Sequence, residues 1–363
     1  MKIGILTFHR AANYGAVLQA YALQHLLELD GFDAEIVDYR CTPIEQMHSP
    51  FYFLHCRGVG NKCKQLLRSP VKWKKRKLFD DFIHRRLKMS EKKAMNREDS
   101  AYFVNETYNI VITGSDQVWN PYLTGGDTTY LLDFVKEDIT KISYAASYGL
   151  SHLPADYSQV YRTLLRRLDK ISVREKQGQM ITQELSGRES QVVLDPTLLL
   201  NASEWKTFMQ PPTMSRYVLL YMIKPGSLLL DRAVKLAKEK NLPLICISDT
   251  LRKQKGIRYI PYASPEQWVG LFAEASYVVT DSFHGTAFSI IFRKAATIGL
   301  SGDKKNGNSR ILDLMKLLGI EAGKEPCFDL GVATDWNRVQ QCLDEFRVCS
   351  RQFLDVLEGV DRC

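Results

Sequence analysis

Several patterns with well-defined chemistry are missing from this chain of 363 residues. Its eight cysteines include no Cys-x-x-Cys pair, which disfavours a zinc site and thioredoxin-like redox chemistry. No apolar run approaches the length of a membrane span, and residues 1–10 lack the long apolar region of a signal peptide. We therefore expect a cytoplasmic protein with free thiols, because disulfides are rare in that reducing compartment.

Common motifs for nucleotides and metals are also missing. Residues 58–60 lack the third glycine and the preceding strand of a dinucleotide fingerprint, and residues 302–307 have phosphate-loop spacing but are followed by Asn308 instead of lysine. No His-Glu-x-x-His, Gly-x-Ser-x-Gly or clear metal cluster occurs, so we expect neither a metal nor a cofactor. The glycine-rich loop still carries Lys304, Asn308 and Arg310, which could cradle an anion. A plain solvated loop is an equally good interpretation.

The formal net charge of +8 comes from one segment. Residues 57–97 hold fifteen Lys and Arg against three Asp and Glu, so the rest of the chain is slightly acidic. Because the positive charge is confined to one segment, the sequence argues against a groove that binds nucleic acid. Apolar residues recur at helical spacing between 73 and 87, which predicts a basic amphipathic helix. It could touch an anionic membrane face through residues 57–97, but a helix docked on its own domain is slightly favoured.

Predicted strands and helices alternate along most of the chain. The first strands lie near 3–8, 34–39, 109–113, 142–146, 170–173 and 191–194, and a second series lies near 217–223, 243–247, 277–280 and 295–300. Such alternation implies parallel sheets. We predict two α/β, Rossmann-like domains facing a cleft, an arrangement that resembles glycosyltransferase B. The domains are 1–205, with a basic helical insert at 41–100, and 206–330; a helix in 331–363 is expected to pack back on the first domain.

The stretch from 277 to 288 is the most informative. An apolar strand is followed by Asp281, Ser282, His284 and Gly285, and then by a helical apolar pattern. Ligands bind at the carboxyl ends of strands in open α/β sheets, and helix starts favour anions. A histidine there can bind an anion or move a proton. A buried histidine satisfied by backbone groups is the alternative.

Polar residues follow the other predicted strands as well, and many at one edge suggest a shared cleft. They are His9 and Asn13, Asp116 and Gln117, Ser147 and Tyr148, Arg174, and Asp195. Arg174 can recognise a carboxylate or phosphate bidentately, or form a salt bridge with Glu175 or another acid. Asp195 precedes Pro196 and could simply cap a turn.

In this order the motifs resemble those of the polysaccharide pyruvyl transferase family. They are Thr7-Phe8-His9, Asn13-Tyr14-Gly15-Ala16 with Leu18-Gln19, Gly114-Ser115-Asp116-Gln117-Val118-Trp119-Asn120, Ser143-Tyr144-Ala145-Ala146-Ser147, Ser172-Val173-Arg174-Glu175, Asp195-Pro196-Thr197 and Thr280-Asp281-Ser282-Phe283-His284-Gly285. The resemblance implies transfer of a pyruvyl group from phosphoenolpyruvate to a sugar of a bacterial surface polysaccharide precursor, as a cyclic ketal. The implied acceptor is a lipid-linked or nucleotide-linked saccharide, on the side of the first domain, with the donor on the side of the second.

The resemblance also implies roles for single residues. Arg174, the helix start at Gly285 and Lys304 or Arg310 would hold phosphoenolpyruvate, His284 would donate a proton or bind the phosphate, and Asp116 would accept protons from sugar hydroxyls. Tyr148 would stack on the sugar. The other candidates for substrate binding are His9, Asn13, Gln117, Ser147, Asp281, Ser282 and Asn308. Ser282 stands where some members of the family carry arginine.

Two other functions remain open. A glycosyltransferase using a nucleotide-sugar would share the fold, and a non-catalytic protein on the same scaffold would bind a glycan or a membrane without turnover. We see no decisive nucleotide signature for the first, and the sequence indicates no oligomeric state.

Overall fold

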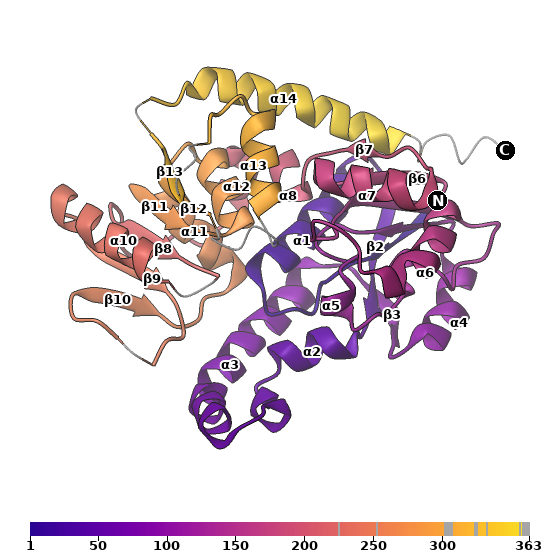
Figure 1. Cartoon of the computed structure of the whole chain (residues 1–363), viewed down its shortest axis with the longest axis horizontal. Helices are drawn as coiled ribbons and strands as arrows, with labels where there is room; N and C mark the ends of the chain where they lie inside the picture. The colour runs from indigo at the N-terminus through magenta and orange to yellow at the C-terminus, as the bar shows by residue number, and fades with distance from the viewer. Residues whose placement is uncertain are drawn as a thin grey trace.

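The computed structural model describes residues 1–223, 226–251, 253–300, 308–322, 326–331, 333–355 and 357. Two mostly parallel sheets lie side by side and carry helices on their faces (Figure 1). We call the part built on the first sheet the N-terminal lobe and the part built on the second sheet the C-terminal lobe. The predicted fold class, two α/β units with parallel sheets, is confirmed.

The first sheet has seven strands in the order β3-β2-β1-β4-β5-β6-β7, all parallel. Its strands are β1 (Lys2–Leu6), β2 (Asp33–Tyr39), β3 (Met89–Ala94), β4 (Ile110–Thr113), β5 (Thr140–Ala146), β6 (Lys170–Val173) and β7 (Gln191–Val192). The helices of this lobe are α1 (Tyr14–Leu29), α2 (Thr42–His48), η1 (Tyr52–His55), α3 (Val59–Arg86), α4 (Arg97–Thr107), α5 (Pro121–Thr124), η2 (Thr129–Leu131), α6 (Ala155–Arg166), α7 (Lys176–Ser186), α8 (Pro196–Leu199) and α9 (Ala202–Phe208).

The second sheet has the order β10-β9-β8-β11-β12-β13, and only β13 runs antiparallel to its neighbour among the described strands. Its strands are β8 (Val218–Tyr221), β9 (Leu244–Ile247), β10 (Ile257–Ile260), β11 (Tyr277–Thr280), β12 (Ala295–Gly299) and β13 (Cys327–Leu330). The helices are α10 (Ser227–Lys240), α11 (Pro265–Glu274), α12 (Phe283–Ile291), α13 (Asn308–Leu317), α14 (Trp336–Gln352) and η3 (Phe353–Asp355).

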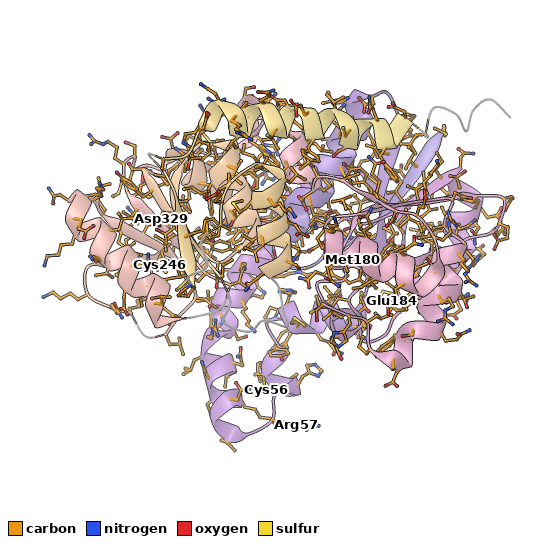
Figure 2. The ribbon with its side chains drawn as sticks, turned by 45° about the horizontal axis from the view of Figure 1, so that its top comes forward. Cys56, Arg57, Met180, Glu184, Cys246 and Asp329 are labelled. Atoms are coloured by element: carbon orange, nitrogen blue, oxygen red, sulfur yellow. The ribbon has the colours of Figure 1, made fainter. Side chains whose placement is uncertain are left out.

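The basic segment differs from the prediction in two ways. It contributes β3 to the edge of the first sheet, and α3 begins at Val59 and continues through Pro70, whereas the predicted helix lay between 73 and 87. The second half of α3 buries Phe79, Phe82 and Ile83 in the core, as the docked interpretation requires. The first half projects from the body, with Cys56 and Arg57 near the tip of the projection (Figure 2).

One hydrophobic core runs through both lobes. Tyr14, in the first turn of α1, stacks on Trp268 of α11 with ring centroids 5.4 Å apart, and it also contacts Tyr221 of β8. Its hydroxyl donates to the carbonyl oxygen of Ala263 at 3.3 Å and accepts from the N–H of the same residue at 3.2 Å. Because aromatic packing and buried hydrogen bonds meet at this residue, the start of α1 is fixed against the C-terminal lobe.

Helix α14 spans both lobes on one side of the molecule (Figure 1). Arg347 donates to the carbonyl oxygens of Leu198 at 2.7 Å and Leu200 at 3.1 Å, and the Ser350 hydroxyl accepts from the N–H of Leu194 at 3.0 Å. The helix therefore joins the C-terminal end of the described chain to the loop after β7. Among the described residues no helix is long and apolar enough to cross a membrane.

The junction of the lobes predicts a strong effect of Gly270→Ala. A Cβ atom at this position of α11 would collide with the backbone carbonyl of Gln210, in the connection between the two sheets. We expect the free energy of unfolding to fall by about 1–3 kcal/mol, because overpacking against backbone has no easy relief. Thermal unfolding followed by circular dichroism measures this. Gly60→Ala is the matched control, since nothing lies within 4 Å of a Cβ there; equal melting temperatures for the two variants would contradict the prediction.

Candidate active site

The carboxyl ends of neighbouring strands bring the main candidates together. Ser115 and Asp116 follow β4, Arg174 follows β6, and Asp195 lies in the loop after β7. His284 comes from the other lobe, in the first turn of α12 after β11. Parallel strands end at one edge of the sheet, so residues far apart in the sequence converge there.

Asp195 is the centre of this cluster. Its Oδ2 atom lies 2.9 Å from Nη2 of Arg174 and 3.6 Å from Nε2 of His284, and it is fully buried. The Ser115 hydroxyl lies 3.2 Å from the same oxygen and accepts from Arg174 Nη2 at 2.6 Å. Oδ1 accepts from the N–H and hydroxyl of Thr197, so Asp195 also caps α8, as the turn interpretation predicts.

The electrostatics keep Asp195 ionised. Burial alone would raise the pKa of its carboxyl, but the Arg174 guanidinium and the nearby His284 imidazole hold this pKa well below the usual range. A buried carboxylate shared by an arginine and a histidine fixes both side chains. The alternative partner for Arg174, Glu175, instead accepts from Ser147 at 2.8 Å.

Several donors in the cluster point at no acceptor. Among the residues that the structure describes, Nε and Nη1 of Arg174, Nε2 of His284 and Nε of Arg310 are buried without a hydrogen-bond partner. Nη1 of Arg174 is 3.7 Å from the Asp116 carboxylate, which is too long for a hydrogen bond. Buried donors without partners are rare in proteins. Four of them in one place fit a ligand with several acceptor oxygens.

Phe283 brings the two guanidinium groups together. The guanidinium carbons of Arg174 and Arg310 lie 5.1 Å and 5.9 Å from the centroid of its ring. Burial lowers the pKa of Arg310, and the positive charge of Arg174 lowers it further. Two like charges held close together are the arrangement that an anion stabilises.

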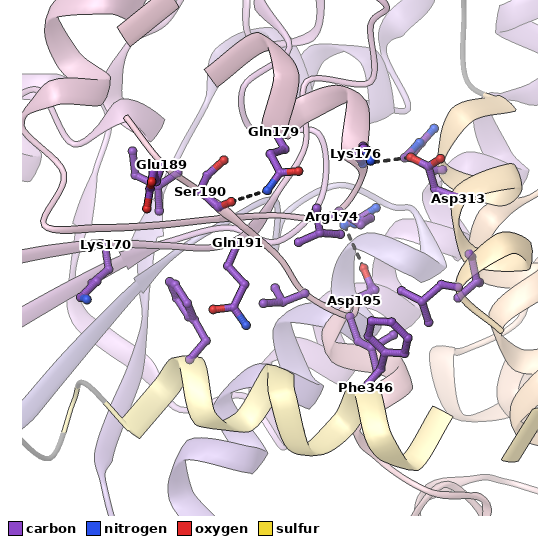
Figure 3. A pocket seen from close by; sticks show the side chains of 18 of the residues that line it. Lys170, Arg174, Lys176, Gln179, Glu189, Ser190, Gln191, Asp195, Asp313 and Phe346 are labelled. Atoms are coloured by element: carbon purple, nitrogen blue, oxygen red, sulfur yellow. Dashed lines mark hydrogen bonds and ion pairs between the residues drawn. The ribbon is translucent and has the colours of Figure 1, made fainter. Parts of the chain in front are cut away.

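A cavity of about 1420 Å³ opens beside these arginines, between the two lobes (Figure 3). Arg174, Asp195, Phe283 and Arg310 are among its lining residues, whereas Asp116 and His284 are not. The backbone N–H of Lys176 donates to Asp313 of α13 at 2.9 Å and so links the lobes at this cavity. Arg174 and Arg310 therefore line a space large enough for a substrate.

The imidazole of His284 is held from the other side by Gly15. A Cβ atom on this residue would collide with the ring, so only glycine lets α1 approach it this closely. Ser282 caps α12 by accepting from the N–H of Gly285 at 3.2 Å, and a Cβ on Gly285 would collide with Thr280. The N–H of Gly285 is thus occupied by the helix cap, and binding of a ligand by this helix start stays a prediction.

Other predicted residues lie away from the cluster. Tyr148 is fully buried and contacts Trp119 and the Thr182 hydroxyl, so its ring is not available to a sugar. His9 is equally buried, with Nε2 3.1 Å from Asp38, and burial lowers its pKa. Both follow strands, but their side chains turn into the interior.

The remaining predicted residues have local roles. Asn13 caps α1, Gln117 accepts from Asn120, and Asp281 accepts from the N–H of Ile223 at 2.6 Å. Asn308 begins α13, and Lys304 lies outside the described residues. Sequence reasoning missed the roles of Ser115 and Phe283. Both lie within the family motifs quoted above, next to Asp116 and His284, and that adjacency was the available signal.

Comparisons with known proteins agree with this arrangement. The sequence profile described as polysaccharide pyruvyl transferase matches residues 13–301. No curated protein matches the chain. A protein from Listeria monocytogenes described as a UDP-N-acetylglucosamine 2-epimerase has a similar fold, with a TM-score of 0.51, 12% identity and coverage of 99% of this chain and 89% of that one.

A second similar structure is the UDP-GlcNAc 2-epimerase from Neisseria meningitidis bound to UDP-GlcNAc, with a TM-score of 0.49, 10% identity and coverage of 99% of this chain and 100% of that one. The likeness to the protein from Listeria monocytogenes, together with the two mostly parallel sheets, shows a fold of the glycosyltransferase B type. Within the described part of the chain, no group of three or more His, Cys, Asp or Glu could hold a metal ion. Because the profile covers well over half of its length, the chain belongs to the polysaccharide pyruvyl transferase family.

Proposed function

We propose that this protein transfers a pyruvyl group from phosphoenolpyruvate to a sugar of a bacterial surface polysaccharide precursor, on the cytoplasmic side of the membrane. The observation that carries the proposal is the pair of guanidinium groups on Phe283, with unfilled buried donors, beside His284. Family membership supports the reaction class. The acceptor would be a saccharide attached to a lipid or nucleotide carrier.

Phosphoenolpyruvate matches the donors of the cluster. It is small and carries a phosphate and a carboxylate, and Arg174 offers Nε and Nη1, two nitrogens without a hydrogen-bond partner, while Asp195 and Ser115 contact Nη2. Arg310 adds a second guanidinium from the other lobe. Arginine suits such a ligand because its planar donors match the oxygens of both groups.

The reaction needs one proton donor and one acceptor. His284 would protonate the methylene carbon, and the cationic centre formed at the neighbouring carbon would be attacked by a sugar hydroxyl. Phosphate then leaves with its bridging oxygen, and a second hydroxyl closes the ketal. Asp116 would accept the hydroxyl protons; one of them restores His284 and the other leaves with phosphate. A positioned acid or base contributes about 10²- to 10⁴-fold.

The rival function is sugar transfer from a nucleotide-sugar, because the structural neighbours include nucleotide-sugar enzymes. A ligand-stabilisation experiment is the most direct test. We expect millimolar phosphoenolpyruvate to raise the melting temperature, because a ligand at one hundred times its Kd adds about 2.7 kcal/mol to the free energy of unfolding. No stabilisation of the wild type would overturn the assignment of the donor.

Arg174→Lys should abolish that stabilisation. Lysine keeps the positive charge beside Asp195 but has a single ammonium group, so the free donors Nε and Nη1 are lost. The unliganded protein should therefore unfold at nearly the wild-type temperature, while phosphoenolpyruvate no longer shifts it. Arg162→Lys, on an exposed part of α6, is the matched control. A full ligand-induced shift in Arg174→Lys would contradict the role of this residue.

Gly15→Ala tests the position of His284. The added Cβ would displace the imidazole, so we expect turnover to fall roughly 10²-fold, the lower end of what a positioned acid contributes, with stabilisation by phosphoenolpyruvate largely kept. Phosphate release from phosphoenolpyruvate in the presence of nucleotide- and lipid-linked saccharides measures turnover. Gly60→Ala should leave the rate unchanged. Wild-type turnover by Gly15→Ala would rule out His284 as the proton donor.

A further inference from the structure

A second cavity, of about 840 Å³, lies between α3 and the loops after β8 and β9. The first turn of α1 contributes Asn13 and Tyr14, and the C-terminal lobe contributes Tyr221 and Asp249. Its volume is in the range of small-molecule sites. None of the functional roles described so far uses it.

The lining of this cavity has a large excess of positive charge. Among its described residues, the cationic side chains are Lys64, Arg68, Lys72, Lys75 and Lys253, and the only carboxylate is that of Asp249. Asp249 is already bonded to Arg68, with Nε to Oδ2 at 3.0 Å. Four of the five cations come from α3 at spacings of four, four and three residues. That spacing places them on one helix face.

Two of these lysines rest on aromatic rings instead of carboxylates. The Lys75 ammonium lies 4.8 Å from the ring centroid of Tyr14 and 5.4 Å from that of Phe79, and Lys72 lies 4.8 Å from that of Tyr52. No ion pair joins either lysine to a described acidic residue. Burial lowers the pKa of both, that of Lys75 to about 8. An anion in the cavity would relieve this loss of solvation.

The cavity lies close to the candidate active site. Tyr14 lines it, and the next residue, Gly15, contacts the ring of His284. His48 also lines the cavity; burial and then the charges of Lys75, Arg76 and Lys72 lower its pKa to about 4, while Asp116 opposes the shift. His48 therefore interacts electrostatically both with Asp116 of the candidate active site and with the lysines of the cavity.

The outer end of α3 carries exposed apolar residues beside the basic ones. Leu66, Leu67 and Trp73 are more than half exposed, and so are Phe51 and Leu54 in the preceding segment. The first half of α3 and the segment around Cys56 and Arg57 project from the body in Figure 2. Exposed apolar side chains among lysines are typical of surfaces that lie on anionic membranes.

We propose that this cavity binds the diphosphate of a carrier-linked sugar, with Lys72 and Lys75 contacting the phosphate oxygens and the sugar directed along α1 toward His284. Nucleotide and isoprenoid carriers share this diphosphate chemistry, and the exposed apolar residues favour the isoprenoid. The assignment of this ligand as the acceptor rests on the proposed function, whereas diphosphate binding by the cavity does not.

Binding of two probes tests the proposal. UDP-N-acetylglucosamine and geranylgeranyl diphosphate are titrated against the full chain, with N-acetylglucosamine and geranylgeraniol as the phosphate-free comparisons. We expect at least one diphosphate to bind and neither phosphate-free compound to compete with it. Binding of the nucleotide alone would identify a nucleotide carrier, and binding of the isoprenoid alone a lipid carrier. Binding of neither diphosphate would overturn the proposal.

The double variant Lys72→Gln/Lys75→Gln should weaken diphosphate binding by about 10- to 100-fold, the effect of losing charge-assisted contacts. Lys62→Gln/Lys77→Gln, with the same change in charge at two exposed positions of α3, should bind like the wild type. Equal affinities of the two double variants would overturn the proposal.

A pair of readouts keeps the two sites separate. The double variant Lys72→Gln/Lys75→Gln should still be stabilised by phosphoenolpyruvate, which also shows that it folds, and Arg174→Lys should still bind the diphosphate. If phosphoenolpyruvate fails to bind the wild type while diphosphate binding depends on Lys72 and Lys75, the donor assignment fails and the cavity assignment stands. Loss of both ligands in each variant would contradict two separate sites.

Discussion

The buried carboxylate of Asp195 is the interaction on which the candidate active site depends. It contacts Arg174 of its own lobe and His284 of the other lobe, at 2.9 Å and 3.6 Å. Without it, the positive charge of Arg174 would lie in a buried position with only Ser115 as a hydrogen-bond partner at that edge. Because the carboxylate contacts only Nη2 of the guanidinium, Nε and Nη1 keep their donors for a ligand. A single acidic residue thus positions Arg174 and His284 and leaves donors of Arg174 unoccupied.

The order of strands and helices could be predicted from the sequence because buried parallel strands are short apolar runs. The edge strands β3 and β10 escaped prediction for the same reason: β3 has three exposed residues in its middle, and β10 is nowhere fully buried. Pro70 lies within α3, although proline usually breaks a helix. Local sequence does not reveal such exceptions, since they depend on what packs beside the helix.

The same limit applies to the site. Asp116, Arg174, Asp195 and His284 could be grouped because polar residues after parallel strands share one edge of a sheet. His9 and Tyr148 satisfy that rule equally well, yet they point into the interior. Which way a side chain turns at a strand end is set by its neighbours, such as Asp38 for His9. The surroundings of the lysines of α3 could not be predicted from the local sequence either, because their aromatic partners Tyr14 and Tyr52 lie elsewhere in the chain.

The packing of Tyr14 between the lobes has a consequence for how ligands are captured. Hinge opening would expose this ring together with Trp268 and Tyr221, and apolar surface of that size is costly to hydrate. The crevice is therefore shaped when the chain folds and not when substrate arrives. Less conformational entropy is then lost when a ligand binds, which is the advantage of a preorganised binding site.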